Sequence, residues 1–226
     1  MLMVDNSRAR LVFLVFAVLL VASGCTEEDE IPFFPGPEEN IPDSALPFPD
    51  TPEQLMANFQ EIYEAMDVDE YRLILDPAFE THLQQGTMDK FPDVGSTLDV
   101  TEEYRIHERV FMGQPLKDPD GNFLPGIFGF SFSNFRVLVD WGESLPTDPI
   151  PNTLSALYEV DILIDRGQQF STLKVAGSIR FYVATAEGML NGEPKTYYRM
   201  IGQQDLTRGL KGVEEIAWGT LKALYR

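Results

Sequence analysis

The sequence predicts an α+β domain in which helices pack in a curved antiparallel sheet. Apolar residues recur at helical spacing after residue 51, and their period changes to two after residue 127. The strands that follow have one apolar and one polar face, as expected for an antiparallel sheet covered on one side. Helices followed by such strands indicate a sheet that folds over the opening helices. We place this domain at residues 51–226, a length sufficient for one large core.

The first helix is predicted to begin after Thr51. Thr51 can cap the helix, Pro52 suits the first helical position, and Gln54 stands three residues after the cap. The apolar residues that then share one helix face are Leu55, Phe59, Ile62 and Met66. These features predict an amphipathic helix that buries one face.

Two further helices are predicted. The second begins at Asp67, carries Tyr71, Ile74 and Leu75, and ends before Pro77. The third begins at Thr101, whose hydroxyl can cap the acidic first turn, and runs to about Phe111. Residues 80–100 and 203–226 are left without an assigned conformation, although the segment 218–226 is expected to dock on the domain.

Residues 118–122 predict a turn. Their alternating oxygen-bearing side chains are similar to the start of a calcium loop, but Gly129 stands where the closing glutamate should be. We therefore expect no calcium site here.

From residue 128 the pattern predicts strands. Phe128, Phe130 and Phe132 share a face. Phe135, Val137, Val139 and Trp141 continue the apolar pattern one residue out of phase, which predicts a bulge at residues 133–134. The next two runs predict a hairpin whose apolar positions are Tyr158, Val160, Ile162, Ile164, Leu173, Val175, Ile179, Phe181 and Val183. On its polar face, acids are expected opposite bases: Glu159, Asp161 and Asp165 opposite Lys174 and Arg180. One more strand is predicted at residues 197–201.

The first 24 residues have the order of a secretory signal. A basic head with Arg8 and Arg10 precedes the apolar run 11–21, which is too short for a lasting membrane span of roughly 20 residues. The segment Val21-Ala22-Ser23-Gly24-Cys25 resembles a bacterial lipobox, which implies cleavage before Cys25 and acylation of its sulfur. The alternative is an uncleaved anchor helix beside an unmodified cysteine. By the same resemblance, Thr26 in place of aspartate favours the outer membrane of the cell envelope.

Residues 25–50, which begin with the lipidated Cys25, predict a disordered acidic tether. Residues 26–50 contain eight acids, no Lys or Arg, and six prolines, and could reach roughly 75 Å at about 3.1 Å per residue. Its apolar exceptions are Phe33, Phe34, Leu46 and Phe48, which form either a docking strip or unpacked positions in a linker.

The charge of the chain excludes one class of partner. The formal net charge is -19, and removal of residues 1–24 makes the remainder slightly more acidic. Such a chain repels phosphate backbones, so we expect no nucleic-acid binding. It also repels anionic lipid, so contact with the membrane is expected through the acyl chains on Cys25.

The opening of the domain is similar to a known family. Pro52-Glu53-Gln54-Leu55-Met56-Ala57-Asn58-Phe59, Tyr63-Glu64-Ala65-Met66-Asp67-Val68-Asp69-Glu70-Tyr71 and Leu75-Asp76-Pro77-Ala78-Phe79 resemble the start of nuclear transport factor 2-like (SnoaL-like) domains. The resemblance covers residues 51 to about 80 by motif and the rest by element order. It implies a cystatin-like cone with a pocket. Residues 218–225 are also similar to the tail of uncharacterised bacterial lipoproteins, from which no activity follows.

Enzymes of this superfamily place an Asp, His or Tyr inside the cone as general acid or base. By this resemblance the candidates are His82, His107 and Tyr104, with Tyr63 and Tyr71 as further residues that could line a pocket. The alternative for each is a packed or solvated side chain. Asp161 and Asp165 are expected on the outer face and are poor candidates. The sequence has no phosphate loop, nucleophile elbow or His/Cys cluster, so we expect neither cofactor nor metal.

Three functions are left open by the sequence. The preferred one is a non-catalytic binding or assembly module that holds a protein or small-molecule ligand at the envelope. The second is a cofactor-free isomerase, cyclase or hydrolase that uses His82, His107 or a tyrosine. The third is a structural spacer within an envelope complex.

Cys25→Ala should leave the protein either uncleaved or released from the membrane. An acyl chain contributes about 0.8 kcal/mol per buried methylene, and the acidic domain offers no basic surface to replace it. Membrane fractionation of cells that express the variant measures this. Normal cleavage together with salt-resistant sedimentation with the membranes would show that Cys25 is not the anchor.

Overall fold

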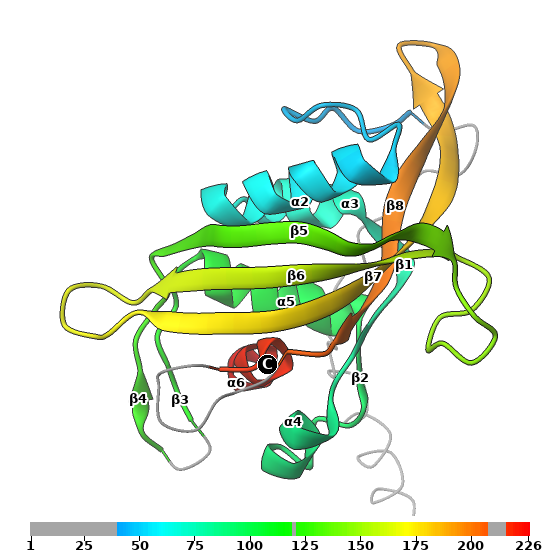
Figure 1. Cartoon of the computed structure of the whole chain (residues 1–226). Helices are drawn as coiled ribbons and strands as arrows, with labels where there is room; N and C mark the ends of the chain where they lie inside the picture. Colours follow the sequence, from blue (N-terminus) through cyan, green and yellow to red (C-terminus); the bar gives the residue numbers. More distant parts are fainter. Residues whose placement is uncertain (1–39, 119–120, 208–215) are drawn as a thin grey trace, which may run out of the picture. The chain divides into compact units, whose positions relative to one another are not determined.

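The computed structural model describes residues 40–118, 121–207 and 216–226 and shows an α+β fold (Figure 1). The helices are α2 (Pro52–Ala65), α3 (Val68–Ile74), α4 (Gln85–Lys90), α5 (Val100–Phe111) and α6 (Trp218–Tyr225). The main sheet has the order β2-β1-β8-β7-β6-β5, and β3 pairs with β4 in a small hairpin. The strands are β1 (Leu75–His82), β2 (Thr97–Asp99), β3 (Leu116–Lys117), β4 (Phe123–Leu124), β5 (Gly129–Glu143), β6 (Leu154–Asp165), β7 (Leu173–Leu190) and β8 (Glu193–Asp205).

The α+β class is confirmed, but the prediction of a purely antiparallel sheet is wrong. Strand β1 pairs in parallel with β8, which makes the six-stranded sheet mixed. The β1–β8 register is irregular between Leu75 and Glu80, the stretch that contains Pro77. A proline has no N–H to give to a ladder, so this segment resembles the end of a helix rather than a strand.

The helix caps agree with the sequence except at α5. Thr51 Oγ1 accepts a hydrogen bond from the Gln54 amide at 3.1 Å, and the Asp67 carboxylate caps α3. Helix α5 begins before the predicted Thr101, because Asp99 accepts from the Glu102 amide at 2.9 Å while the Glu102 carboxylate accepts from the Asp99 amide. This reciprocal capping box satisfies two amides at once, which a single hydroxyl at Thr101 could not do.

The predicted bulge is confirmed, and so is the inner face of the β6–β7 hairpin. Phe128, Val137 and Val139, which were also expected on the apolar face, are instead 65%, 36% and 57% exposed. The β5–β6 register shifts between Phe132 and Asn134, and the apolar hairpin positions point into the core. The outer charge pairs are only partly as expected. Lys174 lies 3.2 Å from Asp161, but Arg180 pairs with Asp148 of the β5–β6 loop. Asp165 is exposed, as expected for the outer face.

Residues 40–50 dock on the domain. The Ile41 amide donates to Met189 O at 2.8 Å, and the Tyr198 amide donates to Pro49 O at 2.9 Å, so this segment pairs with the free edges of β7 and β8. Leu46 packs on the core, and Phe48 lies 5.8 Å from the Tyr197 ring. For these two residues the docking interpretation is confirmed, and the packed domain includes residues before Thr51. Cys25, Phe33 and Phe34 lie outside the described residues.

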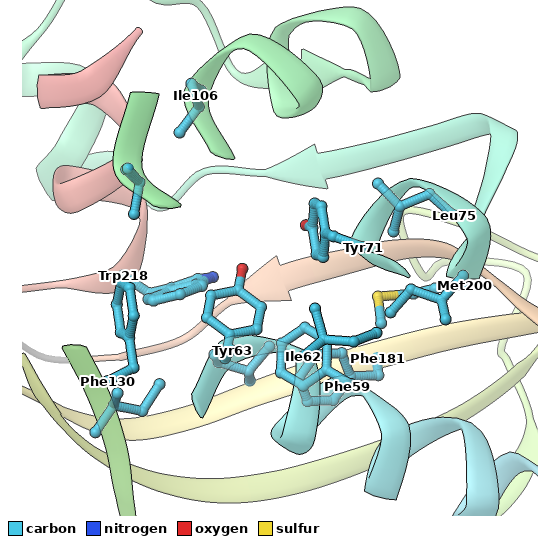
Figure 2. Packing of buried hydrophobic residues seen from close by; sticks show 14 of the residues in the cluster. Phe59, Ile62, Tyr63, Tyr71, Leu75, Ile106, Phe130, Phe181, Met200 and Trp218 are labelled. Atoms are coloured by element: carbon cyan, nitrogen blue, oxygen red, sulfur yellow. The ribbon is translucent and has the colours of Figure 1, made fainter. Parts of the chain in front are cut away.

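Aromatic rings fill the space between α2 and the sheet. Phe59 is 1% exposed and lies 5.2 Å from Phe181 of β7 and 5.9 Å from Phe135 of β5, measured between ring centroids. Figure 2 shows Phe59, Ile62 and Phe181 together, with Tyr63 between this group and Trp218. Helix α2 therefore buries the face that its apolar spacing predicts.

Phe59→Ala should lower the free energy of unfolding by about 3–5 kcal/mol, because it removes a ring that touches both layers of the core. Chemical denaturation of the variant measures this loss. Phe123→Ala is the matched control, since Phe123 is 60% exposed and its loss should change stability by less than about 0.5 kcal/mol. Equal losses in the two variants would contradict the assigned face of α2.

Candidate functional site

The most strongly polar cluster in the described core surrounds Glu103 of α5. Its carboxylate is fully buried and receives Lys222 Nζ of α6 at 2.7 Å on Oε1 and 2.6 Å on Oε2. The Thr81 hydroxyl of β1 also donates to Oε1, and the Tyr71 hydroxyl of α3 donates to Oε2 at 3.3 Å. Four elements of the fold therefore meet at one carboxylate.

His107 extends this cluster by one helical turn. Its Nδ1 lies 2.8 Å from the backbone carbonyl of Glu103 and 3.2 Å from Glu103 Oε2, both of which are acceptors. We therefore assign the proton of the neutral ring to Nδ1, which leaves Nε2 to accept a hydrogen bond from the Tyr63 hydroxyl. The Tyr71 ring stacks on the imidazole with the centroids 3.9 Å apart.

The charges of the cluster stabilise one another. Burial alone would raise the pKa of Glu103, but the Lys222 ammonium and His107 lower it to about 2. Burial lowers the pKa of His107, and the neighbouring Glu103 only partly opposes this, so the ring is neutral near pH 7. Burial also lowers the pKa of Lys222, and Glu103 opposes that shift. The arrangement is a buried ion pair beside a neutral imidazole.

The start of α6 is fixed by a second polar group, Asp205 at the end of β8. Its Oδ2 accepts from the Gly219 amide at 2.8 Å and from Gln84 Nε2 at 3.0 Å. A Cβ at position 219 would stand 2.8 Å from this same oxygen, so the close approach requires glycine. The Thr207 hydroxyl accepts from the Trp218 amide at 2.8 Å. Helix α6 is thus held at its first turn by Asp205 and at its second by Glu103.

The cluster is closed to solvent. His107 is 2% exposed, and its Nε2, the atom that would act as a base, already binds Tyr63. The rings of Tyr63, Tyr71 and Phe111 contact the imidazole. A general base must reach a substrate proton directly or through one water. In this arrangement the polar groups serve to join α5, β1 and α6.

The structure brings together three of the candidates from the sequence and separates the other two. Tyr63, Tyr71 and His107 lie in the cluster. His82 lies at the end of β1, with Nε2 3.3 Å from Glu80, and burial lowers its pKa. Tyr104 lies under the Arg72 guanidinium, 5.8 Å away, and burial raises its pKa. Within the described ranges, no hydrogen bond or ring contact joins His82 or Tyr104 to His107.

Sequence reasoning missed the two residues at the centre of the cluster, Glu103 and Lys222. A signal for each was present. Glu103 precedes His107 by four residues on one helix, a spacing at which side chains meet. Lys222 stands four residues after Trp218 and three before Tyr225, so it falls on the apolar face of its own helix. A lysine at such a position requires a buried anion.

Among the described residues, two surface hollows lie outside the cluster. One has a volume of about 490 Å³ and lies between the segment 113–128 and the β6–β7 turn. We call it the aromatic groove, and its apolar lining consists of Phe123, Phe128, Phe170, Pro115 and Pro125. The other has a volume of about 400 Å³, lies at the β5–β6 loop, and has a more polar lining that includes Ser144, Asn152, Thr153 and Thr185.

Comparisons with protein families and with curated proteins give no relative. No protein-family model matches the sequence, and no curated protein matches it. Among the described helices, none has both the length and the apolar character needed to cross a bilayer. The described side chains likewise contain no group of three His, Cys, Asp or Glu residues placed to hold a metal ion.

Lys222→Met and Glu103→Gln should each lower the free energy of unfolding by about 3–5 kcal/mol, because each leaves a buried partner uncompensated. The double variant should lose less than the sum of the two, by about 0.5–3 kcal/mol. Chemical denaturation of the four proteins measures this coupling. Additive losses would contradict a direct interaction.

The same variants test the pH dependence. Since the pKa of Glu103 falls from 4.5 in the unfolded chain to about 2 in the fold, the unfolded state binds the proton first, and stability from this group is lost as the pH falls from 4.5 to 2. Glu103→Gln should flatten this part of the stability curve.

Proposed function

We propose that this chain is a lipid-anchored envelope protein whose domain is a non-catalytic binding or assembly module. The anchor is Cys25, on the strength of its lipobox-like context. The protein is assigned to the outer membrane because Thr26, and not an aspartate, follows the cysteine of the lipobox-like segment. These assignments rest on sequence patterns in residues 1–26.

We also propose that the domain is nuclear transport factor 2-like. The motif in residues 52–79 supports this, as does the helix pair α2–α3, with α2 packed on β5. In this proposal the interior of the cone is filled by aromatic side chains and by the Glu103–Lys222 pair. The inside of the cone is then a core and not a substrate pocket.

The observation that carries the binding proposal is that the acid–base groups are buried, whereas the exposed groove is lined by aromatic side chains. The acid–base groups around His107 are buried and already paired with one another. The aromatic groove, in contrast, presents Phe123, Phe128 and Phe170 to solvent. This contrast favours binding over the enzyme alternative, in which His107 would act as the base.

The occupant that suits the groove best is a small apolar ligand with an aromatic ring or a short acyl chain. A hollow of about 490 Å³ has the size of a small-molecule site and can bury most of such a ligand. Phe123 and Phe170 lie 6.4 Å apart by their ring centroids, close enough for both rings to contact one ligand.

Phe128→Ser should weaken the binding of an apolar fluorescent probe, anilinonaphthalene sulfonate, to residues 40–226 by about tenfold. The loss of one aromatic contact is worth of the order of 1.4 kcal/mol, which is a factor of ten in affinity. Titration of probe fluorescence measures this.

Leu145→Ser is the matched control, because Leu145 is 61% exposed and Phe128 is 65% exposed, while Leu145 does not line the groove. Its affinity for the probe should equal that of the unmodified domain. Probe binding that survives Phe128→Ser unchanged would remove the groove as the binding site.

A further inference from the structure

Strand β5 forms one edge of the main sheet, and part of this edge is exposed. Helix α2 packs along β5, and Glu64 accepts a hydrogen bond from the Phe132 amide at 3.3 Å. Beyond Phe135, five consecutive residues are exposed: Arg136, Val137, Leu138, Val139 and Asp140. The three apolar side chains among them are 36%, 46% and 57% exposed.

A second bulge explains why so many neighbouring side chains are exposed. Val137 stands opposite Tyr158 and Val139 opposite Leu157, so Leu138 has no opposite residue in β6. A bulge interrupts the alternation of a strand and bends it. An apolar row on a sheet edge is a surface that proteins ordinarily cover or protect with charge.

The sequence of this row is complementary to itself. In a two-fold contact centred on Leu138, the same patch of each copy faces the other with reversed direction. Val137 then meets Val139, and Arg136 meets Asp140, once on each side of the axis. Both ends of the contact therefore bring opposite charges together.

The charged side chains at the two ends have the capacity for such a contact. The Arg136 guanidinium is held by Glu159, with Nη2 2.6 Å and Nε 2.7 Å from Oε2, which leaves further N–H groups for a second carboxylate. Asp140 is exposed, and its carboxylate has neither a hydrogen bond nor an ion pair within the part of the chain that the structure describes. In a chain with a net charge of -19, copies repel one another unless a cation meets an anion at the contact.

We propose that two copies of this chain associate through residues 136–140 of β5, in a two-fold contact of side chains centred on Leu138. The contact does not require a continuous backbone ladder across the bulge. A stretch of five residues buries less than the 1,200–2,000 Å² of a standard interface, so we expect a transient association. Covalent capture is therefore the suitable test.

The experiment uses the full chain in the cells that produce it. Leu138→Cys places a thiol at the two-fold axis, and mild oxidation should give a disulfide-linked dimer on a non-reducing gel. Thr196→Cys on β8 is the matched control, because Thr196 is also an exposed strand residue but lies on the β7–β8 hairpin. A dimer yield for Leu138→Cys at least fivefold above that of the control supports the proposal, and equal yields overturn it.

Charge reversal in the Leu138→Cys background tests the pairing itself. Arg136→Asp or Asp140→Arg alone puts like charges at both ends and should lower the dimer yield at least fivefold. When the two variants are produced together with different tags, each Asp meets an Arg, and mixed dimers should return to at least half of the original yield.

Failure of the mixture to recover, or an unchanged yield with Asp140→Arg, would overturn the proposal. Arg136→Asp also removes the ion pair with Glu159. If that variant does not accumulate in cells, the dimer yield of Asp140→Arg alone tests the proposal. The inference does not use Cys25 or the aromatic groove, so its failure leaves the proposed function untouched.

Discussion

The buried pair of Glu103 and Lys222 is the interaction on which the rest of the domain depends. A buried carboxylate and a buried ammonium each cost several kcal/mol to desolvate, and the cost is offset only if both are fully paired. Here the Glu103 carboxylate also receives the Thr81 and Tyr71 hydroxyls, so its lone pairs are occupied. The pair therefore specifies how α6 docks on α5 and β1.

Much of the secondary structure could be predicted because local signals and burial agree. Helix α2 has a cap, a proline at its first position and one apolar face, and all three indicate the same element. In β6 and β7 the alternation of apolar residues is long enough to define a face. Strand β1 could not be predicted, since its pairing with β8 is long-range and Pro77 resembles the end of a helix. The Thr101 cap was wrong because Asp99 and Glu102 cap reciprocally.

The candidate site was predicted in its aromatic and imidazole part only. Tyr63 of α2, Tyr71 of α3 and His107 of α5 do contact one another. Glu103 and Lys222 each carried a local signal, but 119 residues separate them along the chain, so no local pattern reports that the two meet. The exposed row of β5 was expected to be apolar and inward. The bulge at Leu138 shifts its phase, which turns a predicted core strand into an accessible edge.

The central claim is that the polar cluster around His107 is structural and closed to solvent. Its most direct test is an NMR titration of the two histidine rings between pH 8 and pH 5. The account predicts that His107 titrates below its ordinary pKa of 6.5 and that the proton of the neutral ring is on Nδ1, because burial lowers its pKa and Tyr63 occupies Nε2. A His107 ring that titrates near the ordinary pKa of 6.5 would show that solvent and protons reach it, and would return acid–base chemistry to the interior of this domain.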